Sequence, residues 1–274
     1  MPEEPAPAWP GPPLGWLRAQ FARPAPVLNG WLHLPGGVSA EAMGRAGYDC
    51  LTVDLQHGLI GDGGLVATLQ AVAATPAAAL VRVPALHPPD LMRALDAGAA
   101  GVICPMIDTP EQAAALVSAC RYPPTGTRSS GPTRARLLYG DDYAARADRE
   151  VLVFAMIETR LALEHLDAIL ETPGLDGVYV GPSDLRLSLT GEAGLDFRGG
   201  EVGAAVARVA RAALGRGLVP GIFTPGDELA RAALALGYRL VTAGSDLALL
   251  GGAARTLVAG LRGAPVSPPS SVTY

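Results

Sequence analysis

Lysine is absent from this sequence of 274 residues, since Lys and Arg together number 21 and every one of them is arginine. Without a lysine amine the chain cannot form a Schiff base, so lysine-dependent aldolase mechanisms and pyridoxal phosphate chemistry are excluded. A Walker-A loop is excluded as well, because its lysine contacts the bound phosphates.

Basic patches and long hydrophobic runs are also missing. The net charge is −5, charged residues make up 17% of the chain, and no basic run carries interleaved aromatic residues. A nucleic-acid-binding protein usually carries a basic face, so we expect no nucleic-acid partner. No stretch reaches the roughly 18 uninterrupted apolar residues that span a membrane, and the acidic, Pro-rich start lacks the pattern of a signal peptide. We therefore expect no membrane association.

Cysteine is scarce, and the three residues, Cys50, Cys104 and Cys120, show no CxxC spacing. Each stands in an apolar context, which indicates a small buried hydrophobic residue. An odd number without a disulfide framework is typical of a reducing compartment. The sequence therefore predicts a cytoplasmic protein.

Hydrophobic residues are plentiful, at 49% of the chain, and they follow a repeating pattern. A short apolar run is followed by a break with Gly, Pro or Asp, and then by a stretch of helical period. About eight such units in some 240 residues are typical of a TIM-type (β/α)8 barrel, with a doubly wound open sheet as the alternative. We expect strands at 27–33, 50–54, 79–83, 101–104, 151–157, 176–180, 219–223 and 239–243, and helices at 159–170, 201–216, 226–236 and 246–262.

The two ends of the chain differ from the repeats in composition. A Pro-rich head, 1–13, and a tail, 264–274, are expected to be flexible, which leaves 14–263 as a single catalytic barrel domain. Within it, the segment 121–140 is too long for an ordinary connection, so we expect a functional or oligomer-forming loop.

Two helix starts carry capping signals. Ser39 is predicted to N-cap the first helix after the first strand, with Gly47 at its end. Thr109, followed by Pro110 and then by Gln112 at the third helical position, predicts a capping box.

Polar residues at the carboxyl ends of the strands are the candidate site residues, because the active site of a βα barrel lies there. Together they would place carboxylates, one imidazole and one guanidinium at the same open end of the barrel. The candidates are Asp54, Gln56, His57, Arg82, Glu158 and the turn Gly181-Pro182-Ser183-Asp184. No role is assigned to His33, His87 or His165.

Glu158 and Asp184 are candidate metal ligands. A carboxylate that closes an apolar run such as VLVFAMI is costly to bury unless it is paired or bound to a cation. Two carboxylates without a cysteine or a second histidine suit Mg²⁺ or Mn²⁺, with water and substrate oxygens completing the coordination, and Co²⁺ is a further option. The structural alternative pairs Glu158 with Arg160 or another arginine and makes Asp184 a helix cap.

Arg82 and His57 are candidates for charge stabilisation and proton transfer. Arg82 would provide a fixed cation for a carboxylate or a developing enolate oxygen, or would only neutralise one of the acids. A histidine at a strand end beside acids is a plausible base, although a lone histidine is more often structural. The turn at Gly181 and Pro182 would offer backbone N–H groups to a substrate carboxylate, or would be an ordinary loop.

These residues stand in segments that resemble the HpcH/HpaI aldolase family, the metal-dependent class II pyruvate aldolases of the phosphoenolpyruvate/pyruvate barrel superfamily. The likeness runs from about Asn29 to about Leu261 and covers several motifs in the same order. The segments that carry it are GWLHLPGGVSAEAMGRAGYDCLTVDLQHG, VRVPALHPPDLMRALDAGAAGVICPM, RYPPTGTRSSGPTRA, MIETRLALEHLDAIL and GLDGVYVGPSDL.

The resemblance implies a role for each matched position. Glu158 and Asp184 match the metal-binding carboxylates, and Arg82 the arginine that steadies the keto or enolate oxygen of pyruvate. His57 matches the catalytic histidine, and Asp96 the acid that orients it.

Further positions surround this group. Trp31 matches an aromatic residue at the aldehyde end of the pocket, and Asp54 an acid at the subunit boundary. Ser183 and Asp184 should offer backbone N–H groups to the pyruvate carboxylate. Gln56 and Met156 depart from the Glu and Gln of some members, so the donor and acceptor preferences of those members do not transfer.

The expected activity is reversible cleavage of 4-hydroxy-2-oxo acids to pyruvate or hydroxypyruvate and an aldehyde. Because the chain has no lysine, a metal route is the only reasonable aldolase chemistry. The resemblance also implies a homohexamer, a trimer of dimers that exchange their last helix. Two alternatives remain open: an acyl-CoA lyase of the citramalyl- or malyl-CoA type, and a non-catalytic barrel that binds 2-oxo acids.

Overall fold

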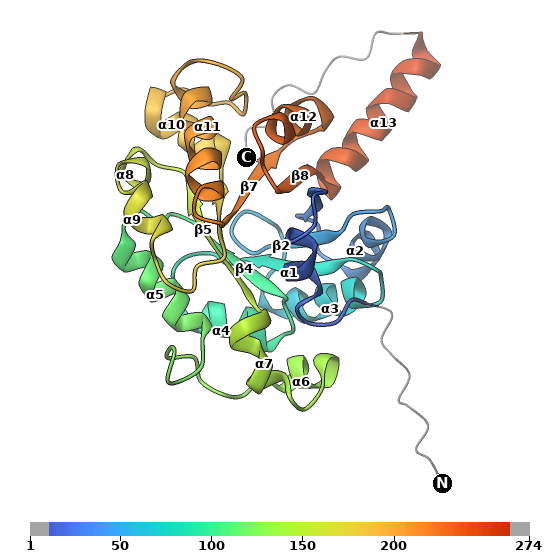
Figure 1. The fold of residues 1–274 in the computed structure, drawn as a ribbon. Helices are drawn as coiled ribbons and strands as arrows, with labels where there is room; N and C mark the ends of the chain where they lie inside the picture. Colours follow the sequence, from blue (N-terminus) through green and yellow to red (C-terminus); the bar gives the residue numbers. More distant parts are fainter. Residues whose placement is uncertain (1–10, 264–274) are drawn as a thin grey trace.

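The strands form a closed parallel barrel. The computed structural model describes residues 11–263, and in it each strand pairs with the next while β8 pairs with β1 (Figure 1). This confirms the TIM-type fold and excludes the open sheet. The strands are β1 (Val27–Leu32), β2 (Cys50–Asp54), β3 (Ala78–Arg82), β4 (Gly101–Cys104), β5 (Leu152–Ile157), β6 (Gly177–Val180), β7 (Val219–Thr224) and β8 (Leu240–Ser245).

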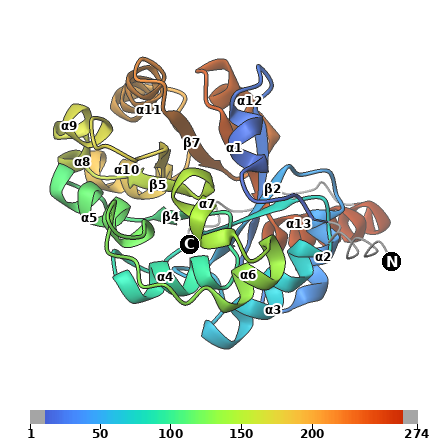
Figure 2. The same ribbon diagram turned by 60° about the horizontal axis from the view of Figure 1, so that its bottom comes forward.

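Helices surround the barrel in a ring, which the turned view shows from below (Figure 2). They are α1 (Trp16–Phe21), α2 (Gly37–Gly44), α3 (Asp62–Ala73), α4 (Pro88–Asp96), α5 (Pro110–Cys120), α6 (Thr133–Tyr139), α7 (Tyr143–Glu150), α8 (Arg160–Glu164), α9 (Leu166–Leu170), α10 (Pro182–Thr190), α11 (Gly200–Leu214), α12 (Asp227–Ala235) and α13 (Asp246–Arg262).

The strands are buried on both faces, which explains why the sequence shows continuous apolar runs instead of alternation. One apolar cluster lies between the sheet and the helices and includes Leu51, Val53 and Val81. A second cluster fills the barrel interior and includes Leu80 and Phe154. The barrel is therefore a packed core, open to a ligand only at its mouth.

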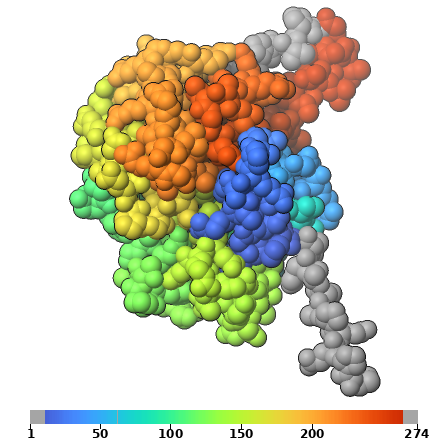
Figure 3. Space-filling view, in the orientation of Figure 1, coloured from blue at the N-terminus to red at the C-terminus, as the bar shows by residue number. Residues whose placement is uncertain are grey.

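Helix α1 closes the amino-terminal end of the barrel. Leu17 is 2% exposed within the interior cluster, and the ring of Phe21 meets Phe154 edge-on at 6.2 Å. In the space-filling view the blue segment that contains α1 covers part of this face (Figure 3). The sequence pattern did not predict α1, because six residues are too few to show a helical period.

The capping predictions had mixed outcomes. The box at Thr109 is confirmed, because Gln112 N–H donates to the Thr109 hydroxyl and the Gln112 side chain accepts from Thr109 N–H. The prediction for Ser39 is wrong. Helix α2 begins three residues earlier than predicted, and its N-cap is Gly36, whose φ of 116° lies in a region that favours glycine. Ser39 lies inside the first turn and donates to the Gly36 carbonyl.

Two predicted segments differ from the structure in detail. The stretch 159–170 is divided into α8 and α9 at His165. The long segment 121–140 is not all loop, because it ends in α6. Its suggested part in function or assembly stays a prediction.

The ends of the chain fall mostly outside the described residues, so the expected flexibility of 1–13 and 264–274 remains a prediction there. Of the head, Gly11 is packed so closely on α3 that a Cβ atom would lie 2.7 Å from the Ala73 carbonyl oxygen. Within 11–263, no helix combines the length and apolar character needed to cross a membrane.

Helix α13 projects from the barrel (Figure 1). Its first residue, Asp246, is the only one of its 17 residues that is buried. Large apolar side chains on it face outward: Leu250 is 63%, Leu257 65% and Leu261 81% exposed. The barrel of this chain therefore leaves the apolar side chains of α13 uncovered.

Candidate active site

A cavity of about 300 Å³ opens at the carboxyl ends of the strands. The predicted residues Trp31, His57, Arg82, Met156 and the turn 181–184 all reach it. Its walls also include residues that the sequence did not single out. The full lining is Trp31, His57, Arg82, Met156, Tyr179, Gly181, Pro182, Ser183, Asp184, Leu187, Ala193, Leu195 and Phe223.

Asp54 lies beneath this cavity and is fully buried. It is the register partner of Arg82 on the neighbouring strand, which places the two side chains next to each other. Arg82 donates to both carboxylate oxygens, from Nε at 2.8 Å and Nη2 at 2.6 Å. Burial alone would raise the pKa of Asp54, but hydrogen bonds from His33 and Arg82 and the charge of Arg82 hold it well below its usual range.

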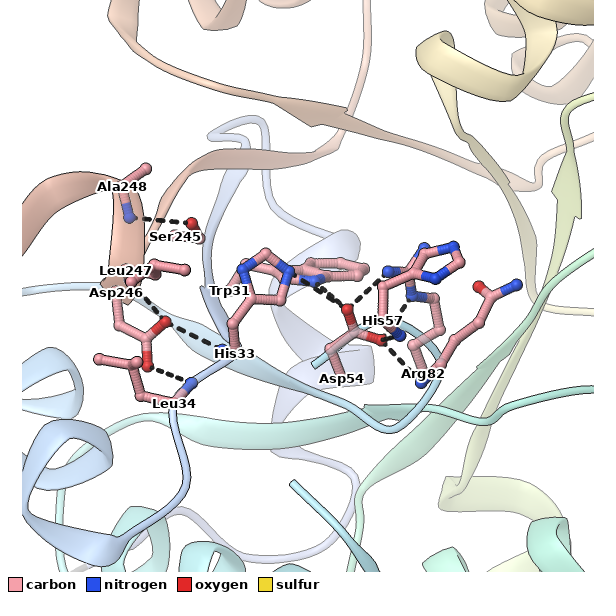
Figure 4. Close-up of polar contacts among 11 residues, drawn as sticks. Trp31, His33, Leu34, Asp54, His57, Arg82, Ser245, Asp246, Leu247 and Ala248 are labelled. Carbon is pink, nitrogen blue, oxygen red and sulfur yellow. Dashed lines mark hydrogen bonds and ion pairs between the residues drawn. The ribbon is translucent and has the colours of Figure 1, made fainter. Parts of the chain in front are cut away.

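The same carboxylate fixes the loop that carries His57. The backbone N–H groups of Gln56 and His57 donate to Asp54 Oδ1 at 3.0 and 3.2 Å (Figure 4). Partial burial and the nearby charge of Arg82 lower the pKa of His57. The imidazole is therefore neutral at neutral pH and able to accept a proton.

Arg82 stands between an anion and an aromatic surface. Its guanidinium lies 4.9 Å from the centroid of the Trp31 ring, whose Nε1–H donates to Asp54 Oδ2 at 3.2 Å. Trp31 in turn contacts Tyr179 and Phe223, with centroid distances of 5.7 and 5.5 Å. Packing and hydrogen bonds thus fix a cation at the cavity wall, as required for a preorganised anion site.

Glu158 has a different environment from Asp54. It is 2% exposed, and its carboxylate accepts from the backbone N–H of Met106, which lies 2.8 Å from Oε1. Burial raises its pKa to about 7, and the neighbouring carboxylate of Asp184 adds to the rise. The backbone of Gly181 lies so near that a Cβ atom there would be 2.4 Å from Glu158 Oε2.

Asp184 is exposed at the third position of α10. The N-cap of this helix is Gly181, without a side-chain hydrogen bond, so Asp184 is not the cap. The backbone N–H groups of the first turn, which include Ser183 and Asp184, are left for water or a ligand. The helix start therefore offers both a carboxylate and anion-binding amides.

These carboxylates fit a divalent cation. Glu158 is a buried charge with little compensation, and Asp184 acts on it electrostatically. Within residues 11–263 no group of three or more His, Cys, Asp or Glu side chains forms a complete metal cage. Two carboxylates with room for water and substrate oxygens match the preferences of a hard ion such as Mg²⁺ or Mn²⁺.

Asp96 does not join the site within one chain. It is the last residue of α4, which runs away from the strand ends, and its carboxylate accepts from Arg128 Nη2 at 2.7 Å. The contact between Asp96 and His57 implied by the family resemblance is thus not made inside this chain. Only the family resemblance had suggested it, and the nine-residue helix α4 carries its last residue away from the strand ends. The orienting role of Asp96 stays a prediction.

Several residues of the site were missed. His33 lies at the end of β1, where the strand-end rule applied, but an isolated histidine gave no further signal. Tyr179 and Phe223 face the barrel interior and needed the register of their strands. Leu195 packs against the interior cluster from a loop whose course the sequence does not reveal.

The described residues form a barrel whose mouth carries a fixed arginine and two neighbouring carboxylates. A profile of the HpcH/HpaI aldolase/citrate lyase family matches residues 31–253. The chain is 44% identical over 237 residues to a hydroxypyruvate/pyruvate aldolase of Rhizorhabdus wittichii. The aligned region covers 86% of this chain and 94% of that protein. It is 37% identical over 244 residues to a 4-hydroxy-2-oxovalerate aldolase of Rhodococcus jostii, covering 87% and 92%.

A solved structure agrees with these relatives. An HpcH/HpaI aldolase/citrate lyase family protein from Burkholderia cenocepacia superimposes with a TM-score of 0.85 at 34% identity, covering 90% of this chain and 99% of that one. The chain belongs to the HpcH/HpaI aldolase/citrate lyase family.

The raised pKa of Glu158 predicts a stability difference that depends on pH. An unfolded glutamate ionises near 4.5, whereas the folded one ionises near 7. In EDTA, Glu158→Gln should be more stable than the wild type above pH 7, by on the order of 3 kcal/mol. The gain should shrink as pH falls from 7 to 4.5 and vanish below, because the wild-type carboxyl is then neutral in both states.

Thermal unfolding at several pH values measures this difference. Mn²⁺ or Mg²⁺ should then raise the melting temperature of the wild type at pH 8 and leave Glu158→Gln unchanged. Equal melting curves of the two proteins at every pH would contradict the assignment of Glu158 as an uncompensated buried charge.

Proposed function

We propose that this chain is a divalent-metal-dependent aldolase that reversibly cleaves 4-hydroxy-2-oxo acids to pyruvate, or hydroxypyruvate, and an aldehyde. The observation that carries the proposal is one cavity lined by a fixed Arg82 cation, His57 and the Asp184 carboxylate. Glu158 is buried directly behind the cavity wall at Gly181, where Asp184 acts on it electrostatically. Relatives with 35–44% identity whose names describe such aldolases support it.

Each group has a role in this chemistry. The N–H groups of Ser183 and Asp184 bind the 2-oxo acid carboxylate, and Arg82 faces the oxygen on which negative charge grows as the enolate forms. His57 takes the proton of the 4-hydroxyl group during cleavage and returns it during synthesis. A divalent cation held by Glu158 and Asp184 would supply Lewis-acid polarisation of the 2-oxo group.

The acyl-CoA lyase alternative loses its main support. It needs a basic surface for the nucleotide, and the arginines between 121 and 136 were the only candidates. Arg121 and Arg128 are 3% and 1% exposed and bind Asp176 and Asp96. Arg134 donates to the backbone carbonyls of Ala97 and Leu69, and Arg136, which is half exposed, pairs with Asp141. These side chains have structural partners, so the cavity favours a small substrate.

The three cysteines take no part in this proposal. All are free and buried, and burial raises the pKa of each thiol, to about 12 for Cys120. Such thiols are poor nucleophiles. They fit the reducing cytoplasm, where we place the protein.

Proton exchange and turnover test the proposed activity together. With Mn²⁺ or Mg²⁺ in D₂O, the methyl signal of pyruvate should disappear by deuteration, and EDTA should stop it, because enolate formation needs the cation. His57→Ala should slow the cleavage of 4-hydroxy-2-oxopentanoate by about 10²–10⁴-fold. His87→Ala, an exposed histidine on another loop, is the control and should keep wild-type turnover.

Glu158→Ala should lose both reactions. A Glu158→Ala protein with full, EDTA-sensitive activity would refute the metal assignment. The protein could instead bind pyruvate and hydroxypyruvate but exchange the C3 protons of neither with Mg²⁺, Mn²⁺ or Co²⁺. That result would favour a non-catalytic binding barrel.

We also propose that two chains exchange helix α13 and that such dimers build a hexamer. The outward leucines of α13 support this, because a partner surface would cover them. Leu250→Arg with Leu257→Arg should lower the oligomeric state in sedimentation velocity runs, since charge would enter the interface. Leu214→Arg, at the end of α11, is the matched control. A wild-type monomer at micromolar concentration would contradict the exchange.

A further inference from the structure

His33 lies between the catalytic residues and the start of helix α13. It follows the last residue of β1 and is 9% exposed. Its ring Nε2 lies 3.2 Å from Asp54 Oδ2, the oxygen that also receives Arg82 Nη2 (Figure 4). His33 thus contacts the carboxylate that fixes Arg82, without reaching the cavity itself.

His33 also holds the loop that carries His57. Its carbonyl oxygen accepts from Leu59 N–H at 2.8 Å. The His33 ring contacts Asp54 at one end of this loop, and the His33 backbone binds Leu59 at the other. The position of His57, between these two points, therefore depends on His33.

A third set of bonds joins His33 to α13. The carboxylate of Asp246, the first residue of that helix, accepts from His33 N–H at 2.9 Å and from Leu34 N–H at 3.1 Å (Figure 4). Asp246 is 4% exposed, whereas the rest of α13 is not buried. The base of this projecting helix is thereby tied to the backbone beside Asp54.

We propose that His33 is a positioning residue that sets Arg82 and His57 through Asp54 and the 54–59 loop, and that it couples the base of α13 to the site. The inference rests on the proposed aldolase function, in which Arg82 and His57 act on the substrate. Replacement of the His33 side chain leaves Asp54 with one donor fewer, whereas the backbone bonds of residue 33 to Leu59 and Asp246 remain. The effect on Arg82 and on the 54–59 loop is therefore transmitted through Asp54. Displacements of a fraction of an ångström at such groups lower rates steeply.

The test compares His33→Ala with His33→Gln, whose amide Nε2 can donate to Asp54 from a similar place. The readout is Mn²⁺-dependent deuteration of pyruvate, measured as kcat and KM, together with the melting temperature. His33→Ala should lower kcat by about 10-fold or more with a change in KM below about 3-fold, and His33→Gln should recover most of the loss. His87→Ala is the surface control.

The outcomes separate the two proposals. If the wild type shows no metal-dependent exchange, the proposed function fails before His33 is tested. If the wild type exchanges and His33→Ala stays within about 2-fold of it, the positioning role is refuted. Equal loss in His33→Ala and His33→Gln, both folded at the assay temperature, also refutes it, because general packing damage would then be the cause.

Asp246→Ala tests the coupling to α13. It should lower kcat in the same direction, and its combination with His33→Ala should lower kcat by less than the product of the two single effects. Multiplicative effects, or wild-type kcat in Asp246→Ala, would show that α13 and the site are independent.

Discussion

The buried carboxylate of Asp54 is the constraint on which the site depends. An ionised group with no exposed surface is stable only where charge and hydrogen bonds replace water. Arg82 provides the charge, and Trp31 with the backbone of residues 56 and 57 provides further N–H donors. One carboxylate therefore holds Arg82, the Trp31 ring and the loop that carries His57 in place at the barrel mouth.

Glu158 shows the opposite solution for a carboxylate of similar burial. Its Oε1 accepts from the backbone N–H of Met106 rather than from an arginine, and burial raises its pKa to about 7. One carboxylate holds an arginine and the other is poorly compensated, so a cation bound beside the second would relieve the cost of its burial. The barrel mouth thus combines a carboxylate whose pKa is held low with one whose pKa is raised.

The sequence predicts the fold well because a barrel buried on both faces produces apolar strands with sharp ends. The boundaries of 50–54 and 101–104 agree with β2 and β4 residue for residue. Arg82, Glu158 and Asp184 could be predicted for the same reason, because they stand where predicted strands end and the site of a βα barrel lies there. Asp96 was expected only from the family resemblance, and within this chain its carboxylate binds Arg128, so its role stays a prediction. The Ser39 prediction fails because Gly36 is the N-cap of that helix. His33 matters only through contacts with residues far along the chain, which no local pattern records.

The substitution Asp54→Asn tests the central claim most directly. It keeps the size of the side chain but removes the charge and turns one acceptor into a donor that faces the donors of Arg82 or His33. The measurement is the rate of metal-dependent deuteration of pyruvate by the folded variant. We expect this rate to fall by about 100-fold or more, because Arg82 and the loop that carries His57 lose their anchor. A rate within a few-fold of the wild type would show that the Asp54 carboxylate does not organise the site.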